Sequence, residues 1–278
     1  MGDLLKCCPC TQAQLQSEAF QQWVPRLKEQ PQLHRKLWEY CYICQALSER
    51  GMLRPGRRGL GFAVGREPLG SLFASFGCEI VATDLDETKA RKKGWMQSQQ
   101  HAAKLETINE RGICPPEAFR RRVSFRPVDM RHIPRDLRDF DFVWSCCSFE
   151  HLGSLRRGER FIYAMTRCLK PGGVAVHTTE FNVLSNTHTI DHSNSNVYRH
   201  RDLARMAGRL RRAGHHLELD FDLGDQPADW QIDRPPYKQE PHLKFQLDDC
   251  LCTSYGLIIE IGRRRTLLDR LLGRRAAA

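Results

Sequence analysis

The chain has 278 residues, of which 41% are hydrophobic and 27% are charged, and its formal net charge is +10. This length excludes a small disulfide-stapled module and suits one large domain with appendages, and the composition argues against a wholly disordered chain. The sequence contains neither the ~20 consecutive apolar residues of a membrane span nor the apolar core of a secretory signal. Twelve cysteines are too few for a disulfide scaffold, so we expect a cytoplasmic protein.

The first 55 residues are expected to form an N-terminal helical cap. Leu33, Leu37, Cys41 and Cys44 share one helical stripe, and Gly51 is a suitable stop. Because both cysteines lie on this apolar stripe, we interpret them as small core residues and not as half of a zinc site.

Residues 56–262 alternate between short apolar runs and helical patterns. Strands are expected at 60–64, 78–83, 123–125, 140–145 and 174–178, and helices at 67–76, 87–107 and 155–169. The alternation predicts an α/β, Rossmann-like fold, in which a mostly parallel sheet is covered by helices on both faces. Further on, we expect a polar loop at 180–197, a helix at 201–213, a strand near 217–219, an irregular stretch at 222–249 and an antiparallel last strand at 254–261.

Residues 263–278 form a basic tail. Six arginines and one aspartate give it five of the ten net positive charges, and its leucines repeat at helical spacing. Such an amphipathic segment can make weak contact with an anionic surface, although a solvated terminal helix is the simpler interpretation. No obligate nucleic-acid partner is indicated.

Polar or glycine-rich residues follow all five strands at their carboxyl ends, the edge at which open parallel sheets bind ligands. They are Gly61, Ala63, Gly65 and Glu67 in the first loop, then Asp84, Asp129, Met130, Ser145, Cys146, Glu150, His151 and Glu180. Five such ends in succession are hard to explain by packing, so the sequence predicts a ligand cleft.

Asp84 and Glu67 indicate which cofactor this cleft binds. Asp84 lies 19 residues after Gly65, at the end of the next strand, where a carboxylate commonly accepts hydrogen bonds from ribose hydroxyls. Glu67 stands near the start of the first helix, where it would repel the pyrophosphate of a dinucleotide, although Arg66 could offset that repulsion. The pair favours S-adenosylmethionine over a nicotinamide dinucleotide.

Five ordered runs resemble the motifs of class I S-adenosylmethionine-dependent methyltransferases, and of the bacterial type 11 group in particular. The runs are GLGFAVGREPL at 59–69, ATDLD at 82–86, VDM at 128–130, FDFVWSCCSFEHLGSL at 140–155 and LKPGGVAVHTTEFN at 169–182. The resemblance spans about residues 56–262. The resemblance implies that the methionine part of the cofactor is lined by Gly61, Ala63 and Gly65 and that its ribose is held by Asp84. It also implies that the adenine lies between Asp129 and Met130 and that Ser145 and Cys146 lie under the cofactor.

The first loop departs from this family in two respects. Ala63 and Glu67 stand where the family carries its second and third loop glycines. Gly61 stands where the family commonly carries an acidic residue at the end of its first strand. Glu67 is therefore expected to replace that acid by holding the amino group of the methionine part.

Methyl transfer is an in-line displacement, for which the protein supplies alignment and, when the acceptor is an alcohol, a base. His151 is the first candidate for this base, and positioning of the following helix is an equal alternative. Glu180 is a second candidate, or it orients the acceptor. The expected acceptor is a small-molecule or sugar hydroxyl or amine.

Other interpretations of the sequence stay open. His188, Asp191, His192 and Glu180 could bind a metal, but their spacing matches no strong motif, so no metal site is predicted. The chain could instead be a nucleotide-dependent oxidoreductase on a similar sheet. It could also be a non-catalytic protein that binds RNA or a membrane through its basic tail.

Overall fold

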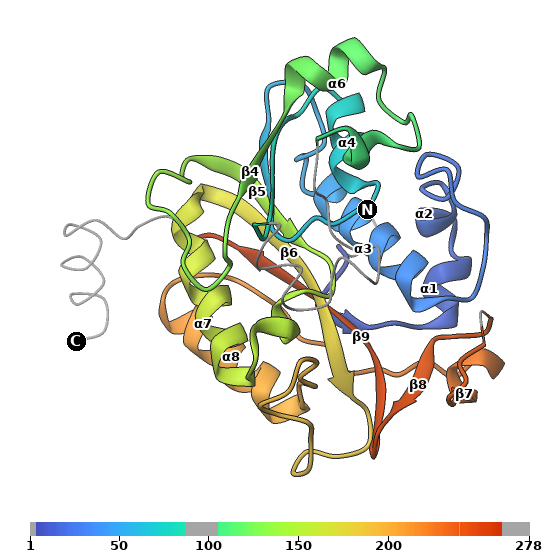
Figure 1. Cartoon of the computed structure of the whole chain (residues 1–278). Helices are drawn as coiled ribbons and strands as arrows, with labels where there is room; N and C mark the ends of the chain where they lie inside the picture. Colours follow the sequence, from blue (N-terminus) through green and yellow to red (C-terminus); the bar gives the residue numbers. More distant parts are fainter. Residues whose placement is uncertain (1–3, 87–104, 239, 263–278) are drawn as a thin grey trace.

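The computed structural model describes residues 4–86, 105–238 and 240–262 (Figure 1). Most of the helix expected at 87–107 and the whole basic tail lie outside these residues. Within the described part, Leu105–Asn109 is a short 3-10 helix, η1.

One sheet, in the strand order β4-β3-β2-β5-β6-β9-β8-β7, forms the centre of the structure. Its parallel half consists of β2 (Arg58–Gly61), β3 (Glu79–Asp84), β4 (Val123–Pro127), β5 (Phe140–Ser145) and β6 (Leu169–Asn182). The chain runs outward from β2 to β4 and then returns to β5, so the order reverses between β2 and β5. A reversal of this kind opens a crevice at the carboxyl ends of the two strands. This arrangement confirms the Rossmann-like fold.

The other half of the sheet is built around β9 (Cys250–Glu260), which runs antiparallel to β6, as expected for the last strand. It also pairs with β8 (Lys244–Leu247), which is joined to β7 (Ile232–Asp233), and with the N-terminal β1 (Cys8–Pro9). The N-terminal segment therefore contributes a strand to the sheet as well as helices.

Helices cover both faces of the sheet (Figure 1). One face carries α3 (Arg35–Glu49) and α4 (Leu69–Ser75), and the other carries α7 (Leu155–Met165) and α8 (His200–Arg212). The remaining helices are α1 (Gln12–Gln16), α2 (Glu18–Gln21), α6 (Pro116–Arg122) and the 3-10 turns η2 (Phe149–Leu152), η3 (Thr166–Cys168) and η4 (Pro227–Trp230).

The N-terminal residues share one hydrophobic core with the rest of the chain. Trp38 and Tyr42 of α3 are fully buried, and their rings stack with centroids 4.7 Å apart. The ring of Tyr42 lies over Gly256 of β9, where a methyl group would come within 2.1 Å of it. The boundary at residue 55 between a cap and a catalytic domain stays a prediction, since the core crosses it.

Several expected elements have different bounds in the structure. The strand expected at 174–178 begins at Leu169 and ends at Asn182, because β5 pairs with Leu169 and β9 offers partners from Val174 to Asn182. It thus includes the Lys-Pro-Gly-Gly turn and also Glu180, which was expected in a loop. The strand expected at 60–64 ends at Gly61, and the helix expected from Glu67 begins at Leu69.

The segment after α8 also differs from expectation. The strand expected at 217–219 is reduced to two isolated bridges, from Leu219 to Cys7 and from His216 to Glu260. The stretch at 222–249, expected to be irregular, contains η4, β7 and β8. Its strands are short, so they show no clear period in the sequence.

All twelve cysteines are free thiols, and eleven of them are buried. Cys41 and Cys44 lie in the core of α3, as expected for small apolar residues. Among the described helices, none has both the length and the apolar character needed to cross a membrane.

The packing of Tyr42 on β9 predicts opposite effects for two glycine-to-alanine changes. Gly256→Ala should lower the free energy of unfolding by about 1–3 kcal/mol, because the new methyl group overpacks the core. Gly208→Ala, on α8 with only Arg212 near the new methyl group, should raise it by up to about 1 kcal/mol through helix propensity. Urea unfolding of both variants checks this. A Gly256→Ala protein as stable as the original would contradict the packing.

Candidate functional site

Two adjoining pockets lie at the carboxyl ends of the parallel strands. The narrow pocket is formed by residues that follow β2, β3, β4 and β5, among them Ala63, Asp84, Asp129 and Met130. The wide pocket, of about 520 Å³, extends from the same first loop toward α3, β6 and β8. Ala63, Ser148 and His151 line both pockets. The structure therefore brings the ends of five strands into one cleft, as the sequence predicts.

The loop after β2 folds back onto Asp84. Ala63 and Gly65 have φ values of 49° and 51°, a left-handed conformation that suits glycine best. This bend lets the N–H of Gly65 donate to Oδ2 of Asp84 at 3.1 Å, while the N–H of Leu85 donates to Oδ1 at 2.7 Å. Asp84 is buried at the base of the narrow pocket. Two backbone donors thus fix the carboxylate in place.

Asp129 and Met130 form the opposite wall of the narrow pocket. The guanidinium of Arg131 donates to Asp129 at 2.7 Å and lowers the pKa of that carboxyl to about 2. Met130 is buried beside it and offers an apolar surface. The wall therefore combines a permanently ionised carboxylate with a thioether, a combination that suits a heteroaromatic ring with exocyclic donors.

Glu67 enters the wide pocket from the turn before α4. The indole N–H of Trp144 donates to its carboxylate at 2.7 Å. Burial raises the pKa of Glu67 to about 8, and Trp144 and Lys36 offset part of this rise. The group therefore gains a proton easily and is stabilised as a carboxylate when a cation approaches it.

Two residues expected to contact the cofactor lie outside both pockets. A side chain on Gly61 would come within 2.4 Å of Trp144, so this glycine makes room for the indole. Ser145 is fully buried and shares a hydrogen bond of 2.7 Å with Nδ1 of His177. Cys146 does line the wide pocket, and its thiol donates to Oε2 of Glu39 at 3.1 Å.

Both candidate catalytic residues line the wide pocket. His151 lies where the two pockets meet, and its Nδ1 contacts the carbonyl oxygen of Asn194. Glu180 is buried, and its Oε1 lies 2.9 Å from the guanidinium of Arg35. Burial raises the pKa of Glu180, and the charge of Arg35 offsets part of that rise.

Sequence reasoning missed the contribution of α3 to this site. Arg35, Lys36 and Tyr40 line the wide pocket, and Arg35 lies over the ring of Phe245 at 4.4 Å. Glu39, on the same helix, is fully buried, yet Lys36 and Arg35 hold its pKa at about 2. The available signal was Glu39 itself, a carboxylate between apolar residues of the helix and four residues after Arg35.

The structure does not bring the possible metal ligands of the 180–200 loop together. His188 pairs with Asp249 at 2.7 Å, and exposed His192 lies beside its neighbour Asp191. Glu180 belongs to β6 and faces Arg35 instead.

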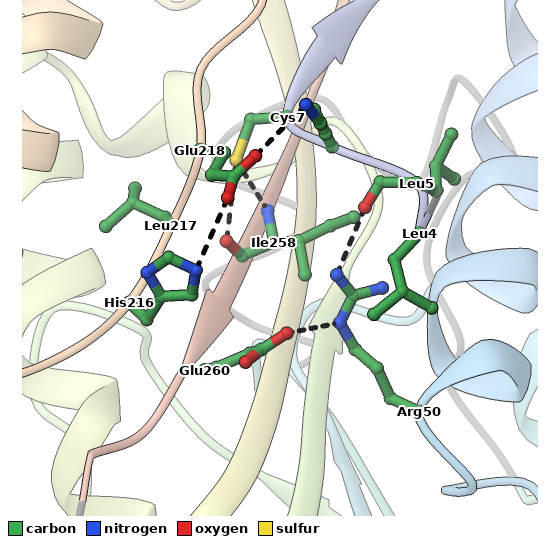
Figure 2. Close-up of a pocket in the computed structure, with 10 residues that line it drawn as sticks. Leu4, Leu5, Cys7, Arg50, His216, Leu217, Glu218, Ile258 and Glu260 are labelled. Carbon is green, nitrogen blue, oxygen red and sulfur yellow. Dashed lines mark hydrogen bonds and ion pairs between the residues drawn. The ribbon is translucent and has the colours of Figure 1, made fainter. Parts of the chain in front are cut away.

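Another cavity, of about 500 Å³, lies beside the end of β9 (Figure 2). Because β9 runs antiparallel to β6, this cavity is at the opposite end of the strands from the cleft. Its charged groups neutralise one another: Arg50 pairs with Glu260 at 2.8 Å, and Lys6 and His216 lie close to Glu218. The cleft is therefore the candidate functional site.

Three solved structures illustrate the likeness of the chain to known proteins. The glycopeptide N-methyltransferase MtfA, solved with sinefungin, is 14% identical, and the match covers 83% of this chain and 87% of that chain with a TM-score of 0.49. An S-adenosylmethionine-dependent methyltransferase from Clostridium acetobutylicum is 13% identical, with 83% of this chain and 92% of that chain covered and a TM-score of 0.45. The cyclase SpnF is 21% identical, with 64% of this chain and 58% of that chain covered and a TM-score of 0.46. The chain thus spans less than two thirds of the length of SpnF. All three TM-scores are below 0.5, and it is the sheet order that identifies the fold.

Part of the sequence matches a known protein family. No curated protein matches the chain. Residues 60–177, from β2 to the middle of β6, match the family described as a methyltransferase domain, type 11. This range contains the glycine loop, Asp84, Asp129 and His151, which the fold gathers in the cleft. Residues 60–177 therefore match a type 11 methyltransferase domain, a domain found in enzymes that use S-adenosylmethionine as their cofactor.

Proposed function

We propose that the protein transfers the methyl group of S-adenosylmethionine to a hydroxyl or amine of a small molecule or sugar that enters the wide pocket. The observation that carries this proposal is the junction of the two pockets at Ala63, Ser148 and His151. A cofactor whose adenosine occupied the narrow pocket would extend past these residues into the wide pocket. The remaining space there is then available to an acceptor.

The cofactor's binding groups are proposed from the charges of the cleft. Asp84 offers a fixed carboxylate to the ribose hydroxyls, and Asp129 with Met130 flanks the adenine. Glu67 faces the amino group of the methionine part, and Gly65, Ala63 and Cys146 form the adjoining wall. When bound, S-adenosylmethionine supplies an electrophilic methyl group.

The acceptor's binding groups come from four parts of the chain. His151 is positioned to accept a proton from an acceptor hydroxyl, and Glu180 to orient the acceptor. Arg35, Tyr237 and Phe245 supply a cation and two aromatic rings to the same wall. This mixture suits a polar small molecule that also carries apolar surface.

Methyl transfer is tested with the purified protein and S-adenosylmethionine carrying an isotopic label in its methyl group. A panel of alcohols, amines and sugars serves as acceptors, and the release of S-adenosylhomocysteine reports transfer to any of them. Mass spectrometry of ligands that co-purify with the protein offers a first choice of acceptors. Failure to bind S-adenosylmethionine in a calorimetric titration would overturn the proposal.

Replacing Asp84 should weaken cofactor binding. Asp84→Ala removes a charged acceptor of ribose hydrogen bonds, so the binding free energy of S-adenosylmethionine should fall by about 1.5–3 kcal/mol in calorimetry. Asp136→Ala is the matched control, because that carboxylate is exposed and pairs only with Arg126 in the described contacts. Unchanged affinity in folded Asp84→Ala would exclude Asp84 as the ribose ligand.

Cofactor affinity should depend on pH through Glu67. Its pKa of about 8 reflects burial and the charges of Asp84 and Glu39, offset by Trp144 and Lys36. The cationic amino group binds the ionised carboxylate, so binding releases a proton, and affinity should rise by up to about tenfold per pH unit from about pH 6 to about pH 8. Glu67→Gln should bind more weakly and without this slope. A slope that persists in Glu67→Gln would assign the proton to another group.

Replacing His151 should slow methyl transfer and leave cofactor binding intact. A general base contributes about 10²–10⁴-fold, so the turnover of His151→Ala should fall by a factor in that range with a hydroxyl acceptor. His216→Ala is the control, since that imidazole is exposed at the opposite end of the strands. If His151→Ala instead lost cofactor affinity and kept its turnover at saturation, His151 would be a residue of the cofactor pocket.

A further inference from the structure

Three side chains with metal-binding atoms converge in the wall of the wide pocket. Cys147 and Glu150 follow β5, Glu180 lies on β6, and one ligand atom from each lies within 4.8 Å of the other two. Cys147 and Glu180 line the pocket, and Glu150 is fully buried behind them. The parallel pairing of β5 with β6 brings them together, so sequence spacing alone does not reveal them.

Two carboxylate oxygens of this group are buried without a hydrogen-bond partner: Oε1 of Glu150 and Oε2 of Glu180. The other oxygen of each carboxylate has a partner. Thr179 donates to Oε2 of Glu150 at 3.2 Å, and Arg35 lies 2.9 Å from Oε1 of Glu180. Nε2 of His151 lies 3.9 Å from Oε1 of Glu150, beyond hydrogen-bond distance. Buried carboxylate oxygens without a partner are costly, so each of these oxygens calls for a cation or a proton.

The charges of the group favour a divalent cation. Ionised Cys147, Glu150 and Glu180 carry three negative charges, and the guanidinium of Arg35 contributes one positive charge. Arg35 also contacts Glu39, whose negative charge equals the positive charge of its other partner Lys36, so this second pair does not change the sum. A cation of charge +2 would therefore leave the cluster neutral.

We propose that Cys147, Glu150 and Glu180 bind one Zn²⁺ ion. A thiolate with two carboxylates gives zinc three protein ligands and leaves a fourth position for water or substrate, which is the usual number of protein ligands in a catalytic zinc site. The thiolate disfavours Mg²⁺ and Ca²⁺, which prefer oxygen ligands alone. On binding, Cys147 releases its thiol proton to solvent as the Zn–S bond forms, and each carboxylate donates one oxygen.

The backbone of Cys147 supports this assignment. Its φ is 41°, in the left-handed region, and its N–H donates to the hydroxyl of Thr178 at 3.0 Å. A residue other than glycine held in this region points to a side chain whose direction matters. Among the described residues, the sulfur of Cys147 accepts from Thr178 at 3.7 Å and from Arg35 at 3.9 Å.

A role for zinc in catalysis rests on the proposed methyl transfer. Because Cys147 and Glu180 line the wide pocket, the fourth position would face the acceptor. A hydroxyl bound there loses its proton more easily, which would assist transfer to oxygen.

Cobalt substitution tests the site without requiring turnover. Co²⁺ added to metal-free protein should produce the charge-transfer absorption of a cobalt–thiolate bond, with one equivalent bound. Cys147→Ser should abolish this absorption, and Glu150→Gln should weaken Co²⁺ binding by at least about 10–100-fold, since even the partners of metal ligands matter that much. Cys250→Ser is the matched control and should keep the absorption, because Cys250 belongs to the separate group with His188 and Asp249.

The outcomes separate the metal site from the proposed function. Absence of the absorption in the original protein, or its loss in Cys250→Ser but not in Cys147→Ser, would overturn the zinc site. Circular dichroism verifies that each variant folds. If Glu150→Gln does not fold, the absorption of Cys147→Ser decides on its own whether the zinc site exists. Absent methyl transfer with an intact cobalt signal would count against the proposed function only, and an absent signal with intact S-adenosylmethionine binding would count against the zinc site only.

Discussion

The negative charge of Glu39, which is fully buried between α3 and the sheet, is the constraint on which the cleft depends. Arg35 and Lys36 approach this carboxylate from the same helix, and Ser254 of β9 donates to it at 2.6 Å. Removal of one partner from a buried ion pair typically costs about 3–5 kcal/mol. The position of α3 against β9 is therefore tied to the neutralisation of one charge.

This compensation also shapes the cleft. The cations that neutralise Glu39 line the wide pocket, and Arg35 reaches on to Glu180 and Phe245. Cys146, from the loop after β5, donates to Glu39 from the opposite side. Stability and binding thus use the same side chains, so α3 is part of the cleft's wall as well as a cover for the sheet.

The parts of the structure that sequence reasoning predicts well are those governed by local pattern. Phe140–Ser145 is an apolar run between breaks and forms a strand with the expected bounds. Gly65 and Asp84 were both expected at the carboxyl ends of neighbouring parallel strands, and in the structure they are in contact. The sequence does not reveal the surroundings of Gly61 and Ser145. These two residues lie against Trp144 and His177, and those contacts form only when the strands pack together.

The parts of the structure that sequence reasoning misses depend on contacts between residues that are far apart in the sequence. The extension of β6 to Asn182 requires the opposing residues of β9, and the cleft residues of α3 require the fold of the whole sheet. Similarly, Glu150 lies beside the candidate base in the sequence, but its juxtaposition with Glu180 exists only once β5 and β6 are paired. A sequence pattern carries little information about contacts of this range.

The pairing of β1 with β9 has a consequence for how the protein acquires its structure. The hydroxyl of Tyr255 on β9 donates to the carbonyl of Cys7, which lies 248 positions earlier in the chain. Contacts between such distant positions raise the contact order and slow folding. During synthesis on the ribosome, the long strand β6 would lack its neighbour until β9 has emerged. The edge of β6 that later pairs with β9 would therefore stay open while residues 183–249 are made, and an open strand edge favours aggregation.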